Sequence, residues 1–133
     1  MFSELIGQVV QAITLEEEGQ TLIIKTDKYK YTFLAEGDCC AHAYVLEPDE
    51  EDLKCFLGNK IVQATSSPVT VTNDDWGNQT DTEFYNLRTH NGDLTLELRT
   101  AHNGYYCGWL KLVGRELIWP IFDDIREKAS RET

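Results

Sequence analysis

Two short stretches of the chain gather the residue types that could do chemistry. Residues 37–44 read Gly-Asp-Cys-Cys-Ala-His-Ala-Tyr, and residues 102–107 read His-Asn-Gly-Tyr-Tyr-Cys. They combine thiols, imidazoles, a carboxylate and aromatic rings, which are the groups used for metal binding, thiol catalysis and ligand recognition. We call residues 37–44 the first corner and residues 102–107 the second corner.

The spacing within the corners does not favour a metal site. Structural zinc is usually held by pairs of cysteine or histidine that are spaced so that both side chains face one ion. Cys39 and Cys40 are adjacent, and adjacent side chains of an extended chain point to opposite faces. We therefore expect no metal and no cofactor.

Thiol catalysis is a second hypothesis for the corners. Cys40 with His42, or Cys39 with His102, could serve as nucleophile and base. Acids nearby, such as Asp38, would raise the pKa of a thiol, whereas a nucleophile needs a lowered one. We expect a protein that is not an enzyme, and a thiol or metal-dependent enzyme stays as an alternative.

Binding fits the corners better than catalysis. Tyrosine and tryptophan are the usual anchors of recognition surfaces, and glycine lets a partner approach the backbone closely. The chain has such residues in both corners, and Trp76 lies in a loop-like segment between them. The predicted ligand- or partner-binding residues are Asp38, Cys39, Cys40, Tyr44, Trp76, Asn103, Gly104, Tyr105 and Tyr106.

Composition limits the partners. The chain has 133 residues, which predicts one domain, and 23 acids against 12 bases give a net charge of -11. This balance disfavours general binding to nucleic acid or to anionic membranes. No apolar run reaches the roughly 18 residues of a membrane span, and the N-terminus lacks the pattern of a signal peptide. We expect a cytoplasmic protein.

The elements that must position the corners are mostly strands. Alternating or β-branched apolar residues predict six to seven antiparallel strands, and Asn91-Gly92 predicts a hairpin turn. Two helices are expected, one mid-chain over 48–57 and one C-terminal over 119–129, and 66–81 is expected to be a long exposed loop. The predicted fold class is therefore α+β, with both helices packed on a β-rich antiparallel sheet.

Residues 5–44 and 56–113 show a weak internal similarity. Leu5-Ile6-Gly7 resembles Phe56-Leu57-Gly58, Ile24-Lys25-Thr26 resembles Leu87-Arg88-Thr89, and the two corners fall at corresponding places. We interpret this order as a hypothetical duplication of a three-stranded half, against the alternative of chance likeness between strands. A duplication would make the two corners equivalent and bring them close together.

The corners also resemble a family. Gly37-Asp38-Cys39-Cys40 followed by Tyr44 looks like a Gly/Gln-Asp-Cys-Cys motif, and 103–106 looks like an Asn-Gly-Tyr-Tyr motif. Both occur together in an uncharacterised family of small phage and bacterial proteins, and the resemblance covers roughly residues 5–113. It implies a phage or prophage setting but carries no established activity.

These observations predict a non-enzymatic phage-type accessory protein that blocks or sequesters a bacterial host component, with host defence as one candidate. Its location would then be the host cytoplasm. A protein inhibitor with an acidic docking face is the lead form, and a sponge for a small nucleotide-like signal is the alternative. The sponge needs converging cations, for which Lys25, Arg88, Arg99 and Lys111 are candidates. A homo-oligomer is compatible with the sequence.

Overall fold

The structure, a computed structural model, describes residues 1–38, 41–102 and 107–118. Within these residues the chain forms nine strands, one α-helix and two short 3-10 helices. In chain order the elements are η1 (Ser3–Leu5), β1 (Val10–Glu16), η2 (Glu17–Gly19), β2 (Thr21–Thr26), β3 (Tyr29–Gly37), β4 (His42–Val45), α1 (Glu50–Phe56), β5 (Gln63–Ser66), β6 (Thr70–Asn73), β7 (Gln79–Arg88), β8 (Asp93–His102) and β9 (Gly108–Leu117).

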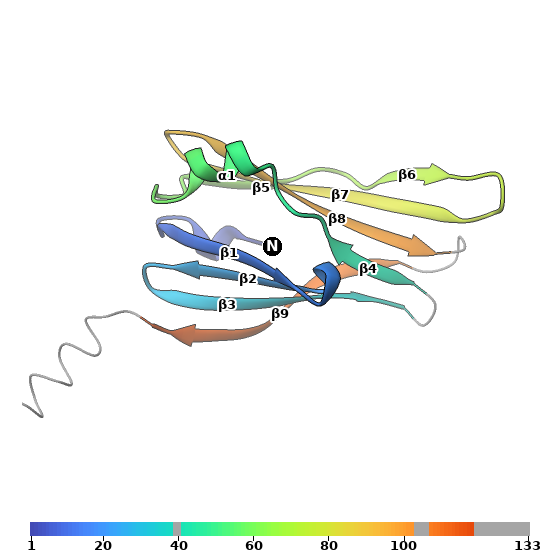
Figure 1. Cartoon of the computed structure of the whole chain (residues 1–133), viewed down its shortest axis with the longest axis horizontal. Helices are drawn as coiled ribbons and strands as arrows, with labels where there is room; N and C mark the ends of the chain where they lie inside the picture. The colour runs from blue at the N-terminus through green and yellow to red at the C-terminus, as the bar shows by residue number, and fades with distance from the viewer. Residues whose placement is uncertain (39–40, 103–106, 119–133) are drawn as a thin grey trace, which may run out of the picture.

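The strands form two antiparallel sheets that lie one above the other (Figure 1). The first sheet has the order β1-β2-β3-β9, and the second has the order β4-β8-β7-β5. β6 also pairs with β7, and the β6–β7 hairpin extends beyond the first sheet at one end of the molecule (Figure 1). The chain is therefore a two-layer β-sandwich.

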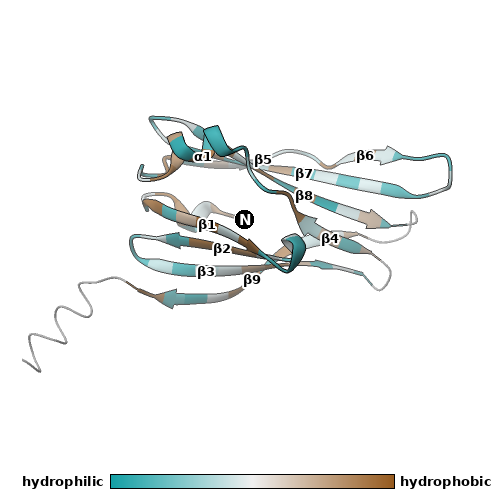
Figure 2. Cartoon of the chain, viewed as in Figure 1, coloured by the Kyte–Doolittle hydropathy of each residue, from teal (hydrophilic) through white to brown (hydrophobic). Residues whose placement is uncertain are grey.

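The core fills the space between the sheets. β2 and β8 alternate as the sequence predicts, because Leu22, Ile24, Leu94 and Leu96 are completely buried while Lys25 and Thr95 are exposed. Figure 2 shows long hydrophobic stretches on β1 and β2, whereas the turn of the β6–β7 hairpin is hydrophilic. Each fully buried leucine or isoleucine stabilises the fold by roughly 1.5–3 kcal/mol, so this alternation is the main source of stability.

The two sheets are joined at one side by a short antiparallel ladder. The N–H of Gly7 donates to the carbonyl of Ile61 (2.8 Å), and the N–H of Gly58 donates to the carbonyl of Val10 (2.9 Å). Gly7 and Gly58 both have positive φ, +91° and +84°, which glycine adopts without strain. We call this contact between residues 7–10 and 58–61 the joining ladder.

A buried polar network anchors the joining ladder to the first sheet. The amide of Gln8 donates to the Tyr31 hydroxyl (2.7 Å), and the Thr26 hydroxyl donates to Gln8 Oε1 (2.6 Å). All three side chains are buried, and burial is the main cause that raises the pKa of Tyr31. Because each buried polar group has a partner, the network adds stability where an unpaired group would remove it.

The two halves of the chain each contain a turn of the same kind. Thr26 Oγ1 accepts hydrogen bonds from the N–H groups of Lys28 and Tyr29, and Thr89 Oγ1 accepts them from Asn91 and Gly92. Both threonines are buried and lie at the β2–β3 and β7–β8 hairpins. The shared geometry is compatible with the similarity of 5–44 and 56–113, although the duplication itself stays a prediction.

The prediction of an α+β fold is wrong. The described chain is mostly β, with nine strands in two sheets instead of six to seven in one, and its single α-helix has seven residues. α1 begins after Asp49, whose carboxylate accepts the N–H of Asp52, and it is too short to cover a sheet. The helix expected at 119–129 lies outside the described residues.

The long loop expected at 66–81 is also wrong in part. Residues 70–73 form β6, and Gln79 begins β7, so this segment is mainly a hairpin. β4 and β6 have four residues each, which is too short for an alternating pattern to stand out in the sequence. These two short strands account for most of the difference in strand number.

Gly108, at the start of β9 in the first sheet, packs closely against Thr100 on β8 in the second sheet. A Cβ at this position would meet Thr100 Oγ1 at 2.2 Å and Thr100 Cγ2 at 2.7 Å, and Thr100 on β8 is itself buried. Any side chain larger than hydrogen would force Thr100 to shift. Gly108 is therefore required by packing, and its φ is not in the left-handed region.

We expect Gly108→Ala to lower the free energy of unfolding by about 1–3 kcal/mol, because it overpacks the contact with Thr100. Chemical denaturation followed by circular dichroism measures the change. Gly114→Ala on the same strand is the matched control, since its Cβ would meet only ordinary contacts, the nearest at 3.8 Å. Equal loss in both variants would show that strand propensity, and not the contact with Thr100, explains the effect.

Candidate functional site

The first and second corners meet at one end of the sandwich. Asp38, just after β3, and Cys107, just before β9, extend the pairing of these two strands. The N–H of Asp38 donates to the Cys107 carbonyl (3.0 Å), and Asp38 Oδ2 accepts from the Cys107 N–H (3.2 Å). Asp38 therefore links the first corner to the second through both its backbone and its carboxylate.

The Cys107 thiol is exposed and also donates to Asp38 Oδ2, at 3.4 Å. This hydrogen bond is the first cause that raises the pKa of Cys107, followed by burial and by the charges of Asp38 and Asp81. A thiol that is held protonated is a poor nucleophile. The arrangement at Cys107 does not resemble an activated cysteine.

A second pair of side chains joins the second corner to β7. His102, the last residue of β8, is buried, and its Nε2 lies 3.0 Å from Asp81 Oδ2 on β7. Gln79 Nε2 donates to the other oxygen of Asp81, at 2.8 Å. Both carboxylate oxygens of Asp81 therefore have a polar neighbour, and the pair is fixed in place by strand pairing.

A small hollow opens beside these residues. It is lined by Asp81 and Glu83 from β7, by Leu98 and Thr100 from β8, and by Val69, Cys107 and Gly108. Asp81 is the register partner of Thr100, and Glu83 that of Leu98, so both acids occupy core-facing positions at the end of the sandwich. The described lining contains two carboxylates and no lysine or arginine, which disfavours an anionic ligand here.

The sequence analysis did not identify Asp81 and Glu83 as candidate site residues, although their position in the strand pattern is a signal. They share the parity of Tyr85 and Leu87, which are buried on the same strand. An acid at a core-facing position of a strand is unusual and marks either the end of a core or a polar site. The Tyr85 hydroxyl donates to Glu83 Oε1 (2.7 Å), and burial followed by this neighbour raises the pKa of Tyr85.

Tyr44 lies on the outer face of the second sheet, away from the hollow. It is the register partner of Arg99, and its ring is 5.2 Å from that of His42. Glu97 forms an ion pair with the Arg99 side chain and is the main cause that raises the pKa of Arg99. The structure therefore does not bring Tyr44 together with Asp38 on one surface.

Trp76 lies at the turn of the β6–β7 hairpin and is 87% exposed. The ring therefore makes little contact with the rest of the described chain. The remaining predicted residues, Cys39, Cys40, Asn103, Gly104, Tyr105 and Tyr106, lie outside the described residues.

The four candidate cations of an anion site do not converge. Lys25 and Lys111 lie on the first sheet, while Arg88 and Arg99 lie on the second. Arg88 Nε is 3.4 Å from Asp93 Oδ2, and Arg99 pairs with Glu97. Among the described residues, no three of histidine, cysteine, aspartate and glutamate are placed to hold a metal ion.

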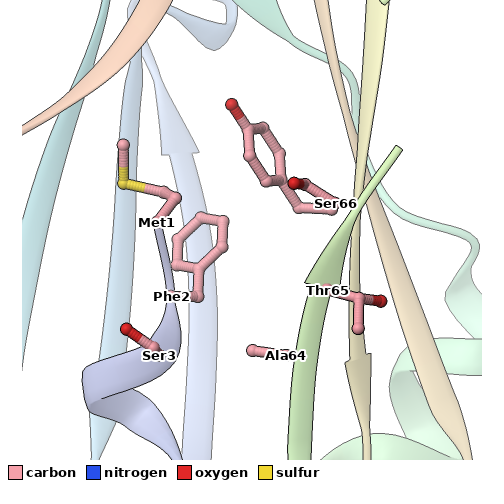
Figure 3. Close-up of a pocket in the computed structure, with 7 residues that line it drawn as sticks. Met1, Phe2, Ser3, Ala64, Thr65 and Ser66 are labelled. Atoms are coloured by element: carbon pink, nitrogen blue, oxygen red, sulfur yellow. The ribbon is translucent and has the colours of Figure 1, made fainter. Parts of the chain in front are cut away.

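A further hollow lies between η1 and β5 (Figure 3). Its lining includes Phe2, Ser3, Thr65 and Tyr85, and Figure 3 shows the Phe2 ring pointing into the space between the two segments. Phe2 is buried and packs edge-on against Phe33 and Tyr85, with ring centroids 5.0 and 5.2 Å away. This hollow is a packing feature at the rim of the core.

These features define a class: a mostly β, two-sheet protein whose chain corners meet through Asp38 and Cys107 at one end. A family model described as "Domain of unknown function (DUF7448)" matches residues 3–112, and the chain belongs to that family. The expectation of an uncharacterised family is confirmed. No curated protein and no solved structure matches the chain. None of the helices in the described part is long and apolar enough to cross a membrane.

We expect Asp38→Asn to lower the pKa of the Cys107 thiol toward its usual value, because it removes the negative charge and weakens the hydrogen bond that favour the protonated form. Alkylation by iodoacetamide across a pH series, quantified on the peptide that contains Cys107, measures this pKa. At a fixed mildly alkaline pH the variant should react faster.

The effect of pH on the stability of the fold follows from the direction of this pKa shift. A raised pKa means that Asp38 stabilises the thiol form, so this contribution is present below the unfolded pKa of cysteine and is lost as the pH rises through the folded value. Asp93→Asn is the control, because Asp93 pairs with Arg88. An unchanged reactivity profile for Asp38→Asn would show that Asp38 does not set the protonation of Cys107.

Proposed function

We propose that this protein is a non-enzymatic binding protein that blocks or sequesters another macromolecule. The resemblance of its corners to phage proteins makes a bacterial host component, including one of host defence, the expected partner. The observation that carries the proposal is the presentation of Trp76, a large apolar side chain that is 87% exposed on a hydrogen-bonded turn.

The turn that carries Trp76 is held by Asp74. Asp74 Oδ1 accepts the N–H groups of Trp76 (2.8 Å) and Asn78 (2.9 Å), while the N–H of Asp74 donates to the Asn78 carbonyl (3.0 Å). The hydrogen bonds from Asn78 and Trp76 lower the pKa of Asp74. Gly77 supplies the positive φ of +81° that the turn needs. The backbone is thus fixed before any partner arrives, which reduces the entropy lost on binding.

Two further apolar side chains are exposed on the segment that leads to Trp76. Val69 precedes β6 and is 52% exposed, and Val71 lies on β6 and is 49% exposed. Tryptophan is among the residue types most enriched at binding hot spots. β6 also pairs with β7 on one side only within the described sheets, so its other edge is open.

The structure gives the competing hypotheses less support. A nucleotide-like anion needs converging cations, and the four candidates lie on two sheets with two of them paired to acids. A thiol enzyme needs a cysteine with a lowered pKa, and the pKa of Cys107 is raised, whereas Cys39 and Cys40, on which that hypothesis rests, lie outside the described residues. We therefore retain protein binding as the function, with the soluble host cytoplasm as its expected place.

We expect Trp76→Ala to weaken partner binding at least about tenfold with little change in stability, because the side chain makes its contacts only with the partner. Wild-type and variant proteins are immobilised and exposed to bacterial lysate. Each protein retained by the wild type is then purified and its affinity for both is measured by biolayer interferometry at two salt concentrations.

Trp109→Ala is the matched control. Trp109 is 39% exposed on β9, and its Nε1 donates to Glu36 Oε1 (3.3 Å). The proposal requires that Trp76→Ala lose the partner while Trp109→Ala keeps it. If the wild type retains no protein, or if Trp76→Ala binds as tightly as the wild type, Trp76 is not the anchor and the proposal is wrong.

A further inference from the structure

A groove runs between β1 and the segment that links β4 to α1. Two adjoining hollows form it, and they share Leu15 and Glu47 as lining residues. Apolar and aromatic side chains from β1, β4, α1 and the segment between β4 and α1 line it: Ile13, Leu15, Tyr44, Val45, Leu46, Pro48 and Leu53. We call this feature the β1 groove.

One wall of the β1 groove is an open strand edge. β1 is the outer strand of the first sheet, and from Ala12 to Glu16 its described pairing is with β2 alone. Only the beginning of the strand has neighbours on the other side, through the joining ladder at Val9 and Val10. An open edge beside an apolar floor is the arrangement that extended peptides occupy in strand-addition complexes.

Carboxylates surround the groove. Glu18, Glu47 and Glu50 are lining residues, and residues 16–18 and 47–52 together contribute eight acids. Across 16–20 and 44–54 the single base is Lys54, whose Nζ lies 3.7 Å from Glu51. The groove is therefore an apolar surface inside a concentrated negative potential, which attracts cationic partners.

The acidic turn of η2 is pinned in place against β4. A Cβ on Gly19 would meet the Val45 carbonyl oxygen at 2.3 Å, and Gly19 has φ +88°. Glu17 and Glu18, which precede it, have φ of +52° and +57°, a region that disfavours side chains with a Cβ. Figure 1 shows η2 beside β4, with the chain running from there toward α1 above β1. The rim of the groove is thus built on a strained but well-packed turn.

We propose that the β1 groove binds an extended basic segment of another protein, in which lysine or arginine alternates with apolar side chains. In an extended chain, alternate side chains point to opposite sides. One set would therefore enter the apolar floor at Ile13, Leu15 and Leu53, while the other set would reach the surrounding carboxylates. This binding site does not involve Trp76, so it stands or falls independently of the proposed function.

The negative charge around the β1 groove favours a basic peptide over other possible ligands. A nucleic acid or an anionic lipid surface would be repelled by the eight carboxylates, since binding to phosphates requires neutralising bases. A second copy of this chain that pairs through the same patch would bring the same acids to the groove, and a copy that binds through another face would still carry a net charge of -11. A basic peptide meets both the potential and the apolar floor.

The test uses a fluorescent peptide in which lysine alternates with leucine, titrated with the full-length protein and followed by anisotropy. Two companion peptides separate the contributions: one alternates lysine with serine, and the other alternates glutamate with leucine. We expect binding of the lysine–leucine peptide alone, weakening as salt rises from roughly 20 to 200 mM because rim charges are screened.

Charge reversal locates the site. Glu18→Lys with Glu47→Lys should weaken binding at least about tenfold. Asp75→Lys with Glu116→Lys changes the net charge equally, and these exposed acids lie outside the groove, so its effect should be clearly smaller. In two-dimensional NMR spectra, the peptide should shift the amides of residues 12–19 and 44–53. Thermal melts of both double variants check that they fold.

Three results would overturn the proposal. Equal binding of the lysine–serine peptide would mean that the apolar floor is not used. Equal loss in the two double variants would mean that only net charge matters. Amide shifts centred on β6 or β9 would place the peptide at another strand edge. Because Trp76→Ala is tested with a different partner, failure here leaves the proposed function standing.

Discussion

The joining ladder between residues 7–10 and 58–61 is the contact on which the rest of the structure depends. It ties the start of β1 in the first sheet to the segment that enters β5 in the second, through the hydrogen bonds of Gly7 and Gly58. Leu5, Val10, Phe56 and Ile61 are completely buried around it. The joining ladder closes one side of the sandwich. At the other end, the two corners and the β6–β7 hairpin are held by strand pairing instead.

Much of this arrangement could be predicted from sequence, and the successes share a cause. Burial alternates along the whole of β8, as its sequence predicts, and in β3 the alternate residues Tyr31 and Phe33 are buried. Asn91-Gly92 marks the β7–β8 turn, so pattern and turn chemistry agree there. The failures are β4 and β6, which are short edge strands stabilised by pairing with β8 and β7 rather than by their own pattern. The helix predicted at 48–57 is present, but it has only seven residues and does not form a separate layer on a sheet.

The candidate site was predicted less well than the fold. Comparison of the two halves predicted only that the corners lie close together, and the contact of Asp38 with Cys107 comes from the pairing of β3 with β9. The acids Asp81 and Glu83 beside this contact come from a strand that the sequence did not connect with the corners. Their placement depends on the register of β7 against β8, which no local pattern encodes. The net charge follows directly from the composition. The concentration of acids around the β1 groove could not be predicted, because it depends on the packing of η2 against β4.

The open edges of β6 and β9 have a consequence for the behaviour of the protein at high concentration. Val69, Val71, Val113 and Leu117 are roughly half exposed on or beside these edge strands, and such edges can pair with those of another molecule. The net charge of -11 opposes that encounter through mutual repulsion. The protein therefore resists aggregation through its charge and not through blocked strand edges. Its colloidal stability should be weakest near the isoelectric point of about 4.6, where the repulsion disappears while the edges stay open.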